Sequence, residues 1–245
     1  MLAAEPVRFT VAFGGGPPLE VRLHDLDRLP EPPEAERLSS ERERSGRFHR
    51  PEDGRRFVVR RHLLRGLLAE RTGRDPLELE PVPDAFGRPI VAGLEPLRFN
   101  TSRSGSRFAI ALFEDDGRGA EPGIDLETLR EIPDAAAVGR RILSDAEARA
   151  LGSGHRLDPP HLLRIWTRKE AVLKSVGRGL TIDPASVTVP LDPSPVSEPT
   201  EVTVPLESGV RRVRLVDPAP GNLPDGVFLS TALAQGAGAG ILDAS

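Results

Sequence analysis

Two acidic residues separated by one position could hold a divalent cation. Asp125 and Glu127 lie in the run Gly-Ile-Asp-Leu-Glu at 123–127. Alternate side chains of a β-strand point to the same face, so these carboxylates would project together while Ile124 and Leu126 face the core. Adjacent carboxylates repel unless a cation or a proton lies between them. Mg²⁺ prefers such hard oxygen ligands, together with substrate phosphates. An exposed strand face is the alternative interpretation.

A second set of chemically capable residues lies some forty positions later. Trp166, Glu170 and Lys174 are four residues apart, which places them along one face of a helix. Glu170 and Lys174 could simply form a surface ion pair worth about 0.2–0.5 kcal/mol, and Trp166 could belong to the core. The chain contains 31 arginines and only two lysines, Lys169 and Lys174, and both lie in this helix.

Positive charge is concentrated in one part of the chain. Residues 42–74 contain eleven arginines and four acidic residues, whereas the net charge of the whole chain is −4. A local excess of this kind favours binding of a discrete anion over general association with nucleic acid. A solvated helix face would produce the same pattern.

Four motifs follow one another along the chain: Gly87-Arg88-Pro89, the run Phe-Asn-Thr-Ser-Arg-Ser at 99–104, the run at 123–127, and Trp166, Lys169, Glu170 and Lys174. Together they resemble the motifs of 4′-phosphopantetheinyl transferases of the surfactin-activating (Sfp) type. Arg103 departs from the family pattern, which usually has histidine there, and Thr101 replaces an aliphatic residue. Arginine keeps the positive charge and can bind phosphate through two parallel hydrogen bonds.

The resemblance implies an α+β pseudo-dimer of two similar halves in one chain, with coenzyme A bound between them. Such enzymes transfer 4′-phosphopantetheine from coenzyme A to a serine of an apo acyl or peptidyl carrier protein. Adenosine 3′,5′-bisphosphate is released and Mg²⁺ is required. The resemblance implies an acidic carrier protein as partner, no nucleic acid or membrane partner, and a monomer. The alternatives are a binding module without catalysis and another magnesium-dependent diphosphate enzyme.

The family's catalytic and metal-binding roles can be carried to matching positions. The resemblance implies that Asp125, Glu127 and Glu170 hold Mg²⁺ and that Glu170 is also the general base for the serine. Lys174 would contact a phosphate oxygen. Lys169 would do likewise, although its direction on the helix differs from that of Glu170 by about 100°.

The coenzyme A contacts follow from the same resemblance. Arg88 and Pro89 would lie near the adenine, and Ser102 and Arg103 near the phosphates. Basic residues for the 3′-phosphate fall at Arg44 and Arg56. The correspondence is loose in this region, so Arg42, Arg47 or Arg55 could take their place.

Several secondary-structure elements must position these residues. Alternating apolar residues predict a hairpin from strands at 7–13 and 19–23. Apolar residues that recur every four positions predict a helix at about 52–72. Strands are expected at 97–99, 107–113 and 123–127, with 102–106 as a turn. A short helix should begin after Ser144 and a longer one span about 160–176. Further β-like runs lie at 187–189, 202–204, 210–216 and 227–229.

This order predicts an α+β fold with two similar halves. We expect an N-terminal half at 1–116, a C-terminal half with the metal site at 117–235, and a flexible tail at 236–245, joined near residues 114–122. The absence of cysteine excludes disulfides, a thiolate nucleophile and cysteine-ligated metal. The sequence has no apolar run of membrane length and no evident secretory signal, so we expect a cytoplasmic protein.

Overall fold

The computed structural model describes residues 5–152, 157–178, 181–219 and 221–236. Its core consists of two four-stranded antiparallel sheets. The first has the order β1 (Val7–Val11), β2 (Leu19–Asp25), β6 (Arg107–Glu114), β5 (Leu97–Ser104). The second has the order β7 (Glu121–Thr128), β10 (Val227–Ala234), β9 (Gly209–Val216), β8 (Thr200–Leu206). The expected α+β architecture with two sheet-containing halves is confirmed.

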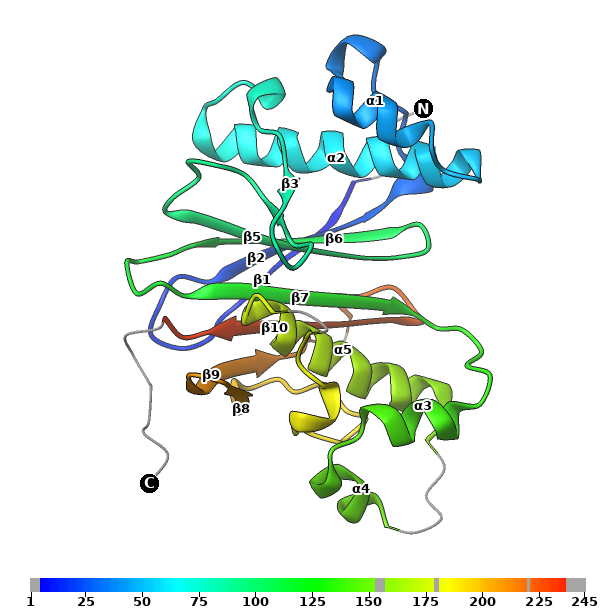
Figure 1. Ribbon diagram of the computed structural model, residues 1–245, viewed down its shortest axis with the longest axis vertical. Coiled ribbons are helices and arrows are strands. Elements are labelled where there is room, and N and C mark those ends of the chain that lie inside the picture. Colours follow the sequence, from blue (N-terminus) through cyan, green and yellow to red (C-terminus); the bar gives the residue numbers. More distant parts are fainter. Residues whose placement is uncertain (1–4, 153–156, 179–180, 220, 237–245) are drawn as a thin grey trace.

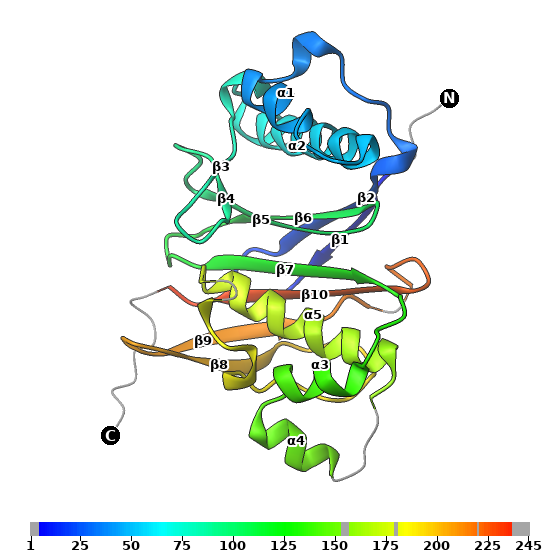
Figure 2. The same cartoon turned by 45° about the vertical axis from the view of Figure 1, so that its right-hand side comes forward.

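The sheets form the middle of four layers (Figures 1 and 2). Helix α2 (Pro51–Thr72) covers the outer face of the first sheet, and α5 (Pro159–Ser175) covers the outer face of the second. One apolar cluster fills the space between the sheets and includes Phe13, Val21 and Ile124, all at most 3% exposed. Two further clusters lie beneath the helices. Burial of these clusters therefore fixes the distance between the two halves.

The two halves share a strand–helix–hairpin unit. In the first half it comprises β2, α2, β5 and β6, and in the second β7, α5, β9 and β10. Each unit places its last strand between the other two. One strand is added to each unit at a different edge: β1 pairs with β2, whereas β8 pairs with β9. Strand β7 consequently remains an edge strand of its sheet.

Local sequence signals explain the limits of the two long helices. Pro51 occupies the first turn of α2, where the missing N–H costs nothing, and Gly73 ends the helix with φ 70°. The side chain of Asp158 accepts a hydrogen bond from the His161 N–H and caps α5. These ends agree with the predicted helices to within about two residues.

The remaining elements are short. They are α1 (Ser39–Ser45), α3 (Ala135–Ile142), α4 (Asp145–Leu151), β3 (Val82–Pro83), β4 (Pro89–Ile90) and the 3₁₀ turns at Leu26–Arg28, Glu34–Glu36, Pro76–Glu78 and Pro184–Ser186. Helix α4 begins with the predicted capping box, in which Ser144 and Glu147 bond to each other's backbone N–H groups.

Two local predictions were wrong. Residues 102–106 were expected to form a turn, but β5 continues to Ser104 and only the following residues turn, with Gly105 at φ 58°. Residues 187–189 were expected to be a strand. They are instead an irregular segment, because their backbone does not pair with a strand. The side chains of Val187 and Val189 are nevertheless buried in the apolar cluster beneath α5.

The chain passes from the first sheet to the second between Glu114 and Glu121. The carboxylate of Asp115 accepts hydrogen bonds from the N–H groups of Gly119 and Ala120, which closes this connection into a compact turn. The division into halves at 116/117 remains a proposal. Nearly all of the expected tail lies outside the described residues. None of the helices in the described ranges is long and apolar enough to cross a membrane.

Buried His24 should make the stability of the fold depend on pH. Burial, reinforced by Arg22 and Arg8, lowers the pKa of His24 from 6.5 to about 4. The unfolded chain therefore takes up the proton more readily, so the contribution of this group is complete above pH 6.5 and is lost as the pH falls toward 4. We expect a loss of about 2–3 kcal/mol in unfolding free energy between pH 7 and pH 4.5.

Urea unfolding of the wild type and of His24→Gln at several pH values measures this contribution. Both proteins share every carboxylate, so subtracting the two curves isolates the histidine. Parallel curves would show that His24 does not contribute.

Candidate functional site

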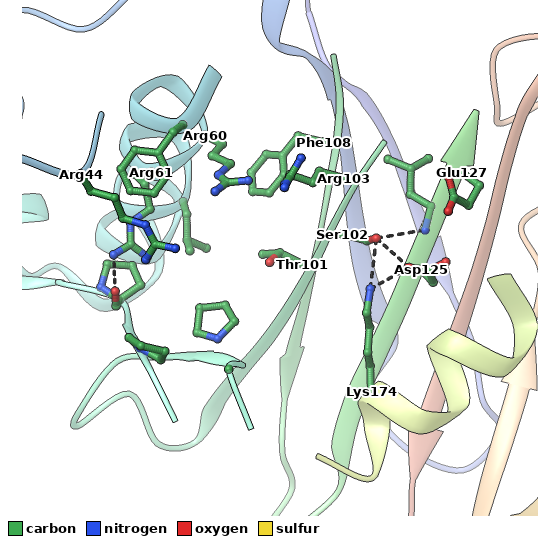
Figure 3. A pocket seen from close by; sticks show the side chains of 17 residues that line it. Arg44, Arg60, Arg61, Thr101, Ser102, Arg103, Phe108, Asp125, Glu127 and Lys174 are labelled. Atoms are coloured by element: carbon green, nitrogen blue, oxygen red, sulfur yellow. Dashed lines mark hydrogen bonds and ion pairs between the residues drawn. The ribbon is translucent and has the colours of Figure 1, made fainter. Parts of the chain in front are cut away.

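A cavity of about 590 Å³ lies between the two halves. Figure 3 shows arginines on one side of it and the Asp125–Lys174 pair on the other. The first half contributes residues from α1, α2, the β3–β4 hairpin, β5 and β6, and the second contributes residues from β7 and α5. The cavity therefore has a cationic side and a side with carboxylates.

Close packing of α5 against β7 brings the second half's residues together. A Cβ atom on Gly123 would lie 2.0 Å from the carbonyl oxygen of Ala171 and 2.6 Å from the backbone N of Ser175. Only glycine permits this approach of strand and helix. It places Asp125, two residues along the strand, opposite Glu170 and Lys174 on the helix.

The hydroxyl of Ser102 joins the two halves at the site. It donates to Asp125 Oδ1 at 2.8 Å and accepts from the backbone N–H of Leu126 at 3.2 Å and from Lys174 Nζ at 3.1 Å. Lys174 Nζ also donates to Asp125 Oδ1 at 2.7 Å. The expected proximity of Ser102, Asp125 and Lys174 is thus present, and one serine satisfies an N–H at the free edge of β7.

Ser104 repeats this arrangement one step along β5. Its hydroxyl donates to Glu127 Oε2 at 2.8 Å and accepts from the Thr128 N–H at 3.1 Å. Glu127 is also paired with Arg130, whose Nη1 lies 2.5 Å from Oε2. The contacts with Ser104 and Arg130 hold the Glu127 carboxylate at the end of β7.

Glu170 lines a second cavity of about 330 Å³ that adjoins the first. Burial raises its pKa to about 7, and the nearby Asp125 carboxylate adds to this effect while Lys174 opposes it. Burial also raises the pKa of Asp125, against the effect of Lys174. Within the described part of the chain, Glu170 Oε1 and Asp125 Oδ2 are buried oxygens without a hydrogen-bond partner.

These two oxygens fit a divalent cation better than the third expected ligand does. Buried carboxylate oxygens without a donor are stabilised by a cation. Glu127, by contrast, is occupied by Ser104 and Arg130. Among the described residues, no three acidic or histidine side chains are grouped closely enough to hold a metal ion as they stand. Asp125 and Glu170 therefore each offer an oxygen of the kind that Mg²⁺ prefers, and Glu127 would have to leave Arg130 to join them.

The cationic side is built around an aromatic ring. Guanidinium carbons of Arg44, Arg60 and Arg61 lie 5.3, 5.1 and 5.7 Å from the centre of the Phe57 ring. Burial lowers the pKa of Arg60 to about 10, with Arg103 as the next cause. No ion pair neutralises Arg44, Arg60 or Arg103 within the described ranges. Like charges held together in a cavity form a site for a multivalent anion.

Arg56 does not contribute to this cluster, which corrects the sequence-based prediction. Its Nε and Nη2 donate to the two carboxylate oxygens of Asp27 at 2.8 and 2.6 Å. It lies outside the residues that line the cavity. Arg44 does line it, whereas Arg60 and Arg61 were not predicted. Their spacing from Phe57, at i+3 and i+4 on one helix face, was the available signal.

Lys169 is also turned away from the site, contrary to prediction. It is fully buried, pairs with Glu147 Oε2 at 2.7 Å and donates to the carbonyl oxygens of Pro184 and Val187. The 100° step between neighbouring helical residues directs Lys169 to a different side of α5 from Glu170. Its role is to fix the 184–187 segment to the helix.

The predicted adenine residues lie at the edge of both cavities. Pro89 lines both, and Arg88 lines the smaller one. Arg88 Nη1 pairs with Glu121 Oε2 at 2.9 Å, which links the β3–β4 hairpin to the start of β7. Arg88 therefore also connects the halves.

The sequence of the chain is similar to those of known 4′-phosphopantetheinyl transferases. Residues 121–212 match the model of the 4′-phosphopantetheinyl transferase superfamily. The chain is 28% identical to a 4′-phosphopantetheinyl transferase of Bacillus subtilis over 62% of its own length and 66% of the relative. It is 32% identical to 4′-phosphopantetheinyl transferase HetI of a Nostoc species over 58% of the chain and 60% of the relative.

The class of protein that the chain resembles is therefore a transferase, as the motifs predicted. A particular relative is 4′-phosphopantetheinyl transferase Sfp of Bacillus subtilis, with 27% identity over 68% of this chain and 74% of the relative. The expected resemblance to the surfactin-activating type is confirmed.

Replacing Gly123 should separate α5 from β7. We expect Gly123→Ala to lower the unfolding free energy by about 2–3 kcal/mol, because backbone atoms of α5 cannot yield to the added methyl group. Gly66→Ala is the matched control, since no atom lies within 4 Å of its added Cβ and alanine favours helix. Urea unfolding of both variants checks the difference, and equal stability would contradict the packing argument.

Proposed function

We propose that this chain transfers the 4′-phosphopantetheine group of coenzyme A to a serine hydroxyl of an apo carrier protein. The observation that carries the proposal is the pair of adjoining cavities: arginines that lack acidic partners line the larger cavity together with Asp125, and Glu170 lines the smaller one, each carboxylate having an unpartnered oxygen. The arginines suit a phosphate-rich substrate, and the carboxylates suit a metal and a base. The similarity to named transferases supports the same conclusion.

The cationic side would bind the phosphates. Arg60 and Arg103 can donate several parallel hydrogen bonds to a phosphate, and binding would relieve their mutual repulsion. Arg44 and Arg61 lie on the same wall and extend this surface. The Lys174 ammonium lies beside Asp125, on the side of the cavity opposite the arginines. It can bind the diphosphate from there as a compact point charge.

The carboxylate side would carry the reaction. Asp125 and Glu170, joined by Glu127, would hold Mg²⁺, which neutralises charge on the diphosphate when bound. The serine oxygen forms a bond to the β-phosphorus and the bond from that phosphorus to the bridging oxygen breaks. Adenosine 3′,5′-bisphosphate leaves with the bridging oxygen. Glu170 accepts the serine proton, a task that suits a carboxylate with an unpartnered oxygen at the edge of the cavity.

The carrier protein is expected to be acidic, so positive charge near the cavity would assist its approach. Arg44 and Arg47 line a shallow depression of about 440 Å³ next to the main cavity. The proposed function thus uses the basic region of the sequence for phosphate binding inside the cavity and for electrostatic attraction outside it.

Glu170→Gln should reduce transfer at least a hundredfold, because the amide can neither accept the serine proton nor balance the metal charge. The intact mass of an apo acyl carrier protein, incubated with coenzyme A and Mg²⁺, measures the reaction. Glu131→Gln, at an exposed position, is the matched control and should transfer normally. Near-normal transfer by Glu170→Gln would refute the assignment, and no mass gain with the wild type would refute the proposed function.

Arg60→Gln should weaken coenzyme A binding at least tenfold, since a hydrogen bond to a charged group contributes about 1.5–3 kcal/mol. Arg56→Gln, which removes a similar charge one helical turn away, should change the affinity less than twofold because Asp27 already holds that side chain. Calorimetric titration of both variants provides the measurement. Equal losses would show that the distinction between these two arginines is incorrect.

A further inference from the structure

The smaller cavity contains a side-chain amide, that of Asn100, which the proposed reaction has not used. This cavity of about 330 Å³ is lined by Asn100, Glu170 and residues of the β3–β4 hairpin. It shares Gly87, Pro89, Thr101 and Lys174 with the larger cavity. The two spaces therefore meet at Thr101 and Lys174, and Figure 3 shows Thr101 between the arginines and the Asp125–Lys174 pair. Glu170 lines only the smaller of these two spaces.

Asn100 is 3% exposed, yet its amide makes no hydrogen bond to another residue in the ranges that the structure describes. It lies on β5 opposite Ala111, a residue too small and apolar to satisfy it. Its amide atoms are not among the fully buried polar atoms that lack a partner, so they face the open space of the cavity that Asn100 lines. An amide that lines a cavity indicates a ligand there.

The neighbours of Asn100 indicate which ligand. A carboxamide can both donate and accept, so it can hold a hydroxyl group through either of that group's functions. Glu170 presents an unpartnered carboxylate oxygen in the same cavity. The arginines that suit phosphate line the other cavity, apart from Arg88, which is paired with Glu121. The two cations that line the smaller cavity, Arg88 and Lys174, are each paired with an acidic residue, so this cavity suits an uncharged hydroxyl held next to a base.

We propose that Asn100 is a catalytic residue that binds the acceptor serine hydroxyl and orients it toward Glu170. The inference rests on the proposed function and adds a residue and a location to it. The Asn100 amide donates to the serine oxygen and leaves the serine O–H directed at the carboxylate. The acceptor enters through the smaller cavity while the diphosphate lies in the larger one, so the two substrates meet at Thr101 and Lys174.

The test compares Asn100→Leu and Asn100→Ala with the wild type. Transfer to a purified apo acyl carrier protein is followed at saturating coenzyme A, and coenzyme A affinity is measured separately by calorimetry. We expect kcat/KM for the carrier to fall at least tenfold in both variants. Coenzyme A affinity and the Mg²⁺ concentration for half-maximal rate should stay within twofold. Thermal stability should change little in Asn100→Leu, because the variant loses no hydrogen bond to another described residue.

Asn222→Leu is the matched control, since it makes the same change at the only other asparagine, which lies in a turn away from both cavities. Unchanged kcat/KM in the Asn100 variants would overturn the proposal. Weaker coenzyme A binding would instead assign Asn100 to the nucleotide substrate, and a raised Mg²⁺ requirement would make it a metal ligand; either result overturns the proposal while leaving the proposed function intact. A wild type that transfers nothing would overturn both.

Discussion

The hydroxyl of Ser102 is the interaction on which the site depends. It has one proton and two acceptor positions, and all three are used by groups of the second half: the Asp125 carboxylate, the Leu126 N–H and the Lys174 ammonium. A side chain of β5 thereby accepts a hydrogen bond from an N–H group at the edge of β7, where no neighbouring strand pairs. The same bonds fix the carboxylate and the ammonium with respect to the arginines of the first half.

Charge is distributed across this junction in an unbalanced way. Arg44, Arg60 and Arg103 lack acidic partners among the described residues, and two carboxylate oxygens lack donors. The arginines and the Asp125 carboxylate line the same cavity without pairing with each other, so each remains available for a ligand of opposite charge. A phosphate-rich molecule with a divalent cation complements both sides together.

Sequence patterns predicted the parts of the fold and site that depend on local periodicity. The hairpin of β1 and β2, the helices α2 and α5 and the facing residues Asp125 and Glu127 follow from spacing of apolar and polar residues. The partners of Arg56 and Lys169 could not be predicted in this way. Asp27 and Glu147 lie 29 and 22 positions away along the chain, so only tertiary packing brings them within bonding distance. Arg60 was missed for the same reason, since its place in the cavity depends on how α2 rotates over the first sheet.

The two strands added to the shared strand–helix–hairpin units explain why the site is not repeated at the symmetry-related position of the described structure, although the two halves are alike. The cavity forms where the edge strand β5 of one unit meets the edge strand β7 of the other. The symmetry-related position would bring β9 against β2. There, β8 covers the edge of β9 and β1 covers the edge of β2. An internally repeated architecture has thus become functionally asymmetric through the placement of one extra strand in each half.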